Sequence, residues 1–134
     1  MTDRTSPSIP RSIVLLRVTV AILLGIHGVF RGVTGGAWLF GAYLSETGIP
    51  FGVGVAWAIT VFEVIAAGFL AAGKFVRFVV PGYAFILTGG IMMVHAREGW
   101  FVVGGGRNGV EYSVLLLVSL AVLFMSHPPL GKRG

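Results

Sequence analysis

The sequence predicts an all-α integral membrane protein, a four-helix bundle with both termini cytoplasmic and an interfacial half-helix in the first outer loop. Two features of composition indicate this class, because 55% of the 134 residues are hydrophobic and 11% are charged, against about 25% charged in soluble domains. The third feature is a set of apolar runs close to the roughly 20 residues that a helix needs to cross a bilayer. These runs are residues 12–30, 53–72, 75–94 and 110–125. They leave room for a single membrane domain, 1–134.

Each run has a start or stop signal that favours a spanning helix. The first follows a polar tail and contains Arg17, a residue that is rare in the core of a signal peptide, so we expect a retained span. The second is interrupted only by Glu63. The third has Pro81 near its start, where the missing N–H of proline costs little. The fourth is stopped by His-Pro-Pro at 127–129, which makes His127 an interfacial residue.

One segment joins the first apolar run to the second and another joins the third to the fourth, and the two differ in character. Residues 37–44 (AWLFGAYL) predict a half-helix at the interface, with Trp38 and Tyr43 as belt residues. A lipid anchor and a lid across a pocket are both compatible with it. The second segment holds three glycines at 104–106 but no strand, Lys or Ser/Thr of a phosphate loop, so it predicts a flexible turn.

The distribution of Lys and Arg predicts the orientation of the chain. Cytoplasmic loops carry an excess of these residues. One side holds Arg4, Arg11, Lys74, Arg77, Lys132 and Arg133, and the other holds Arg31, Arg97 and Arg107. The first side is therefore expected to be cytoplasmic, in a plasma membrane such as a bacterial inner membrane. This asymmetry explains the net charge of +5, so no nucleic-acid partner is expected.

The ionisable residues inside the apolar runs are the candidate functional residues, because a charge at membrane depth is expensive. From the helical rise of about 1.5 Å per residue, His27, His95 and Glu111 fall in one outer layer on three helices. Arg31 lies on the same face of the first helix as His27. Arg17 and Glu63 lie deeper and predict a buried salt bridge between the first two spans, with a proton relay as the alternative.

The residues of the outer layer could bind one of several ligands, or they could bind no ligand. Two histidines on different helices could ligate one haem b, or could hold a metal ion together with Glu111. The same groups could instead bond the carbonyls of a quinone head, whose tail would lie among four phenylalanines, Phe30, Phe40, Phe51 and Phe62. Without a ligand, the imidazole of His27 would bond a backbone carbonyl or Glu111. The chain has no cysteine, so electrons in any redox chemistry would sit on a bound cofactor.

Glycines are expected to let the helices approach closely, since membrane helices associate through backbone packing. The candidates are Gly25, Gly28 and Gly32 on the first span and Gly82, Gly89 and Gly90 on the third.

The chain resembles the DoxX family of small four-span membrane proteins over nearly its whole length. The matching elements are LLRVTVAILLGIHGVFRG, ETGIP, FEVIAAGFLAAGKFVR and GGGRNGVEYSVLLL, in this order. By this resemblance the family's characteristic positions are Arg17, His27, Gly28, Gly48, Pro50, Glu63, Gly73, His95 and Glu111. The family takes its name from a component of a thiosulfate:quinone oxidoreductase, and relatives look like partners of redox enzymes or membrane chaperones. The chain carries no fused soluble domain, so the thiosulfate activity itself is not expected.

Three functions follow as hypotheses. The first is a quinone-linked or redox-associated membrane subunit, with an outer site formed by His27, His95, Glu111 and Arg31 and with electron transfer supplied by a protein partner. The second is a non-catalytic scaffold or assembly factor whose buried polar groups serve packing and docking. The third is a small-solute transporter, which would require a homo-oligomer because four helices with bulky side chains leave little lumen.

Overall fold

The computed structural model describes residues 8–128, and these residues fold into five α-helices and one short 3₁₀ helix. Arg4, Lys132 and Arg133, three of the charges used to predict the orientation, lie outside the described residues. The helices are α1 (Arg11–Val33), α2 (Gly36–Glu46), α3 (Gly52–Ala71), α4 (Val76–Met93), η1 (His95–Glu98) and α5 (Glu111–Ser126). The all-α prediction is confirmed, and the predicted runs coincide with α1, α3, α4 and α5.

Within the described residues, α1, α3 and α4 are long and apolar enough to cross a membrane, and α5 is a shorter apolar helix of 16 residues. This composition supports an integral membrane protein. The predicted half-helix is also present, because α2 covers residues 36–46. Pro81 is a correction: it lies in the second turn of α4, beyond the first turn in which a proline is free of cost, and the Arg77 carbonyl consequently lacks a helical N–H donor.

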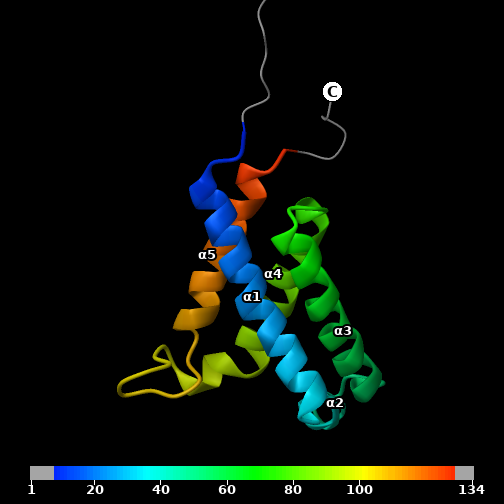
Figure 1. The fold of residues 1–134 in the computed structure, drawn as a ribbon. Coiled ribbons are helices and arrows are strands. Elements are labelled where there is room, and N and C mark those ends of the chain that lie inside the picture. Colours follow the sequence, from blue (N-terminus) through cyan, green and yellow to red (C-terminus); the bar gives the residue numbers. More distant parts are fainter. Residues whose placement is uncertain (1–7, 129–134) are drawn as a thin grey trace, which may run out of the picture.

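The helices run alternately in opposite directions, so that residues 8 and 128 lie at the same end of the bundle (Figure 1). We call this the termini end. The opposite end holds α2 and the segment 96–110, and we call it the α2 end. Four helices form a closed ring in which α1 packs on α3, α3 on α4, α4 on α5 and α5 on α1. Helix α2 packs against α3 and α1. All four ring helices contribute to one core, with Tyr83, Leu70, Leu120 and Leu123 fully buried.

Glycines bring α1 and α3 into close contact, as the sequence predicts. A Cβ atom added at Gly25 would lie 2.9 Å from Cβ of Ala67, and one added at Gly28 would lie 3.0 Å from Cβ of Glu63. The register between these antiparallel helices is therefore fixed, with Gly28 opposite Glu63. On α4 the prediction is confirmed for Gly82, which faces the ring of Phe62, and is wrong for Gly89, whose surroundings are open.

Replacing Gly25 by alanine is expected to destabilise the protein by about 1–3 kcal/mol, because the added methyl forces α1 and α3 apart. The matched control is Gly68→Ala on α3, where an added Cβ meets nothing within 4 Å. We expect the control to be neutral or stabilising, since alanine favours a helix over glycine. The measurement is the unfolding midpoint in an SDS titration, and equal midpoints for the two variants would contradict the prediction.

Candidate functional site

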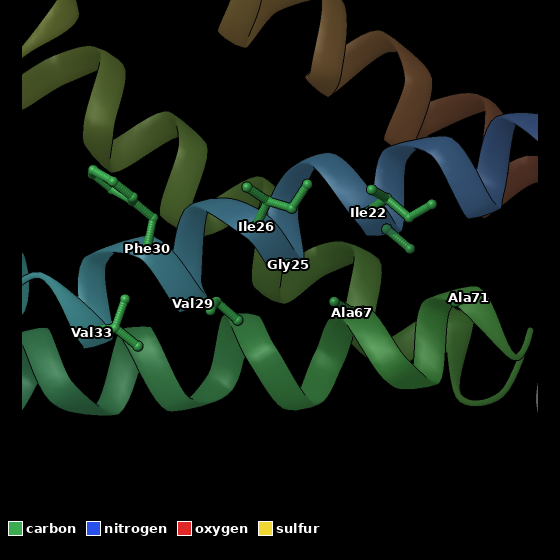
Figure 2. Close-up of a pocket in the computed structure, with 9 residues that line it drawn as sticks. Ile22, Gly25, Ile26, Val29, Phe30, Val33, Ala67 and Ala71 are labelled. Carbon is green, nitrogen blue, oxygen red and sulfur yellow. The ribbon is translucent and has the colours of Figure 1, made fainter.

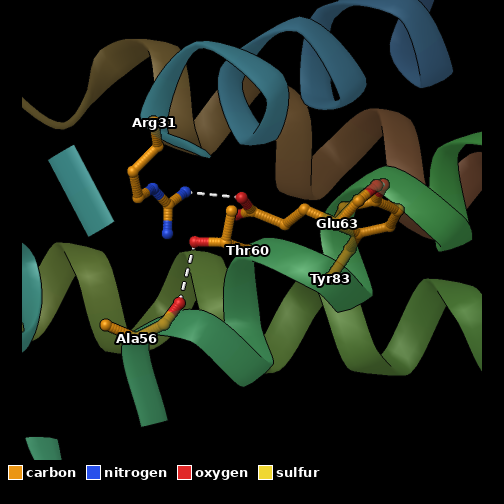
Figure 3. A network of polar contacts seen from close by, with 5 residues as sticks. All are labelled: Arg31, Ala56, Thr60, Glu63 and Tyr83. Carbon is orange, nitrogen blue, oxygen red and sulfur yellow. Dashed lines mark hydrogen bonds and ion pairs between the residues drawn. The ribbon is translucent and has the colours of Figure 1, made fainter. Parts of the chain in front are cut away.

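Glu63, the most buried carboxylate in the described chain, pairs with Arg31. Nη2 of Arg31 donates a hydrogen bond to Oε2 of Glu63 at 2.5 Å (Figure 3). The side chains are 13% and 5% exposed, so the pair is largely desolvated. It connects the last turns of α1 to the middle of α3.

The predicted pair of Arg17 and Glu63 is therefore wrong. Arg17 and Arg31 lie on the same side of α1, but the register places Gly28, not Arg17, opposite Glu63. Eleven residues separate position 17 from position 28, which is about 16 Å along a helix. Arg31 is one turn from the contact and reaches the carboxylate, whereas Arg17 bonds Nε2 of His127 at the termini end.

Two further helices meet the ion pair. The hydroxyl of Tyr83 on α4 donates to the backbone carbonyl of Glu63 at 2.5 Å. The guanidinium of Arg31 lies over the ring of Phe40 on α2, 5.3 Å from its centroid, a geometry in which the ring face attracts the cation. We call these four residues, Arg31, Phe40, Glu63 and Tyr83, the Arg31–Glu63 centre. It joins α1, α2, α3 and α4 at one point.

The hydrogen-bonding capacity of this centre is only partly used within residues 8–128. A guanidinium has five N–H donors and a carboxylate has two acceptor oxygens, yet one bond joins Arg31 to Glu63. A charged group in a low-dielectric site gains from every additional polar partner. The centre can therefore accept a further group that offers a hydrogen-bond acceptor to Arg31.

His27 is an exposed side chain on α1, one turn before Arg31. At about 100° per residue, His27 and Arg31 are roughly 40° apart around the helix axis. Residues four apart are neighbours on a helix surface, so His27 lies beside Arg31, which pairs with Glu63.

His95 and Glu111 both hold the segment between α4 and α5, and their role in binding a ligand stays a prediction. Nδ1 of His95 donates to the carbonyl of Asn108 at 2.7 Å, and Oε1 of Glu111 accepts a bond of 2.7 Å from the backbone N–H of Val102. In the part of the chain that the structure describes, no three His, Asp or Glu side chains gather closely enough to hold a metal ion. The metal hypothesis therefore gains no support.

An apolar groove of about 550 Å³ runs along α1 and α3, lined by Ile22, Ile26, Phe30, Ala67 and neighbouring residues (Figure 2). None of the candidate site residues lines it. The four phenylalanines predicted to surround a quinone tail differ in their surroundings. Phe30 lines the groove, Phe40 lies against Arg31, and Phe62 packs on Tyr83 with centroids 5.5 Å apart. Phe51 is 88% exposed.

Sequence reasoning missed a second polar cluster at the termini end. The sequence predicts an interfacial His127, but this residue is 5% exposed and contacts both Arg17 and Arg77. The signal available in the sequence was the presence of Arg17 and Arg77 near the ends of two helices that meet the end of the last one. Periodicity alone gives no reason for these three residues to converge.

The fold and the centre together define a helical, membrane-type protein with a buried ion pair and an exposed histidine beside it. Comparisons with models of known protein families, with curated proteins and with solved structures find no match. The function therefore has to be inferred from the residues of this chain.

Proposed function

We propose that the chain is a four-span membrane protein of the DoxX type that serves as a quinone-linked, redox-associated subunit. The fourth crossing is α5, whose 16 residues span about 24 Å and which closes the helix ring. Arg11, Lys74 and Arg77 flank the termini end, so by the positive-inside rule that end faces the cytoplasm of a bacterial inner membrane. The Arg31–Glu63 centre then lies toward the outer leaflet.

The observation that carries the functional proposal is the unused hydrogen-bonding capacity of a buried ion pair beside the exposed His27. A quinone head carries two carbonyl oxygens that accept hydrogen bonds and that take up protons on reduction. Arg31 and His27 supply N–H donors for these oxygens, and Glu63 supplies a carboxylate for proton exchange. The electrons for this reduction come from a redox protein partner.

The test is a quinone analysis of the lipids that co-purify with the protein in detergent. We expect wild type to retain quinone and His27→Ala to lose several-fold of it, the effect of losing one hydrogen bond worth about 1 kcal/mol. His95→Ala is the matched control, because its imidazole bonds the Asn108 carbonyl. An absorption spectrum checks for haem b, which would be lost in both variants. Wild type without quinone, or full retention in His27→Ala, would reject the proposal.

The second candidate is the non-catalytic scaffold, and a specific observation favours it. Two of the predicted ligand residues, His95 and Glu111, have structural partners in the 96–110 segment. Helix α2 also presents Trp38 and Leu39, 59% and 76% exposed, as a surface for lipid or a membrane protein. Co-purification of a stoichiometric partner from His27→Ala cells, together with a quinone-free wild type, would favour the scaffold.

Solute transport gains less support from the packing. Tyr83, Leu70, Leu120 and Leu123 fill the centre of the ring, so a path would need an interface between copies. No residue of the Arg31–Glu63 centre needs such an interface to make its contacts.

A further inference from the structure

The termini end holds a cluster of two arginines and one histidine, which we call the Arg17–Arg77–His127 cluster. Nη1 of Arg17 bonds Nε2 of His127 at 3.1 Å. Nε and Nη2 of Arg77 both donate to the backbone carbonyl of His127, at 3.1 and 2.9 Å. Three helices, α1, α4 and α5, are joined through this one residue, which is 5% exposed.

The hydrogen bonds fix the charge state of His127. Nδ1 lies 2.8 Å from the carbonyl of Leu123, and because a carbonyl only accepts, Nδ1 carries the proton. Arginine only donates, so Nε2 of His127 must be the acceptor in the bond from Arg17. The imidazole is therefore neutral in this arrangement. The positive charge of the cluster comes from the two guanidinium groups.

No carboxylate of residues 8–128 balances these charges. Glu63 pairs with Arg31, and Glu111 bonds Val102. Glu46 and Glu98 lie in α2 and η1 at the other end of the bundle. Arg11 and Lys74 add positive charge at the termini end. The carboxyl-terminal ends of α3 and α5 offer partial negative charge, about half an elementary charge each, which is less than the two guanidinium groups carry.

The guanidinium of Arg17 is partly desolvated and closely packed. Its Nε is buried and has no hydrogen-bond partner within the described residues. A Cβ at position 73 would overlap the Arg17 guanidinium, and Gly73 adopts a φ of +70°, where other residues are strained. Arg77 is positioned equally well, 4.2 Å from the centroid of Phe124. A partly buried cation without a counter-charge is costly, and no carboxylate of residues 8–128 supplies one here, so the cluster favours an anion beside it.

We propose that the Arg17–Arg77–His127 cluster binds the phosphate group of an anionic phospholipid at the termini end of the bundle. The planar fork of arginine matches the oxygens of a phosphate group. Juxtamembrane cations attract anionic lipids of the cytoplasmic leaflet. Arg77 uses two of its N–H donors on the carbonyl of His127 and has three left for the phosphate oxygens. This site is separate from the Arg31–Glu63 centre and does not depend on the quinone proposal.

The experiment measures phospholipid retained by the full chain after extraction from nanodiscs that hold equal amounts of phosphatidylglycerol and phosphatidylcholine. Native mass spectrometry counts each lipid per protein. We expect wild type to retain phosphatidylglycerol and Arg77→Gln to retain about tenfold less, the effect of losing a charge-assisted fork. Lys74→Gln is the matched control, because it removes one exposed charge at the same end, and we expect it to keep most of the lipid.

Arg77→Lys is a second variant that keeps the experiment interpretable if Arg77→Gln fails to fold. Lysine retains the positive charge but lacks the planar fork of arginine. We expect it to lose several-fold of the phosphatidylglycerol. Equal retention of the two lipids by wild type, or equal losses in Lys74→Gln and the Arg77 variants, would overturn the proposal. A separate titration with inorganic phosphate identifies the source of the phosphate group. Arg77-dependent binding of inorganic phosphate that phosphatidylglycerol does not displace would overturn the assignment to a lipid.

Discussion

Glu63→Ala is expected to lower the free energy of unfolding by about 3–5 kcal/mol, the cost of breaking a buried ion pair by removing one partner. The variant leaves the guanidinium of Arg31 in a site where the side chain is 13% exposed. The Tyr83 bond to the backbone carbonyl of residue 63 survives the substitution, so the loss reports on the charge pair. Unfolding by SDS titration or steric trapping measures it.

The matched experiment removes both charges. Arg31→Met combined with Glu63→Leu is expected to regain most of the stability, because buried ion pairs replaced by apolar residues of similar volume are often neutral or stabilising. Double-mutant cycles then compare the coupling energy of Glu63 with each of the two arginines, Arg31 and Arg17. Arg31 should couple to Glu63 by more than about 1 kcal/mol, whereas Arg17 should be additive with it. Coupling of Glu63 to Arg17 alone would contradict the pairing.

The helices were predictable because each depends on local sequence. Long apolar runs with polar or proline boundaries define α1, α3, α4 and α5, whose ends differ by one to three residues from the predicted runs. Helix α2 was predictable from an apolar segment between glycines. These features need no knowledge of which helix contacts which.

The pairing of Glu63 was not predictable from the same features. Periodicity assigns residues to a face of a helix but does not give the relative depth of two helices. That depth is set by the contact of Gly25 with Ala67 and of Gly28 with Glu63. The first helix carries two arginines on one side, and only this register selects Arg31 over Arg17. Residue counts along a helix do not resolve this choice.

The outer layer was partly predictable. Counting residues predicts His27, His95 and Glu111 at one level, and in the structure all three lie toward the α2 end of the bundle. The count could not show that the 96–110 segment folds back and takes both His95 and Glu111 as its own partners. Segments of this kind satisfy their backbone groups through contacts that have no sequence period.

His127→Ala is expected to lower the free energy of unfolding by about 1.5–3 kcal/mol, the value of a hydrogen bond to a charged group. The substitution removes the acceptor of Arg17, whose Nε has no partner in the described part of the chain. It leaves the backbone carbonyl of residue 127 in place, and that carbonyl is the acceptor for Arg77. The two arginines should therefore respond differently, although both contact the same residue.

A pair of double-mutant cycles measures this difference. Arg17→Met with His127→Ala should show a coupling of about 1 kcal/mol or more, because each single variant breaks the same bond. Arg77→Met with His127→Ala should be close to additive, because the carbonyl bonds are independent of the imidazole. Strong coupling of Arg77 and additivity of Arg17 would contradict the hydrogen-bond assignment. With the observed contacts, the imidazole of His127 anchors α1, and its carbonyl anchors α4.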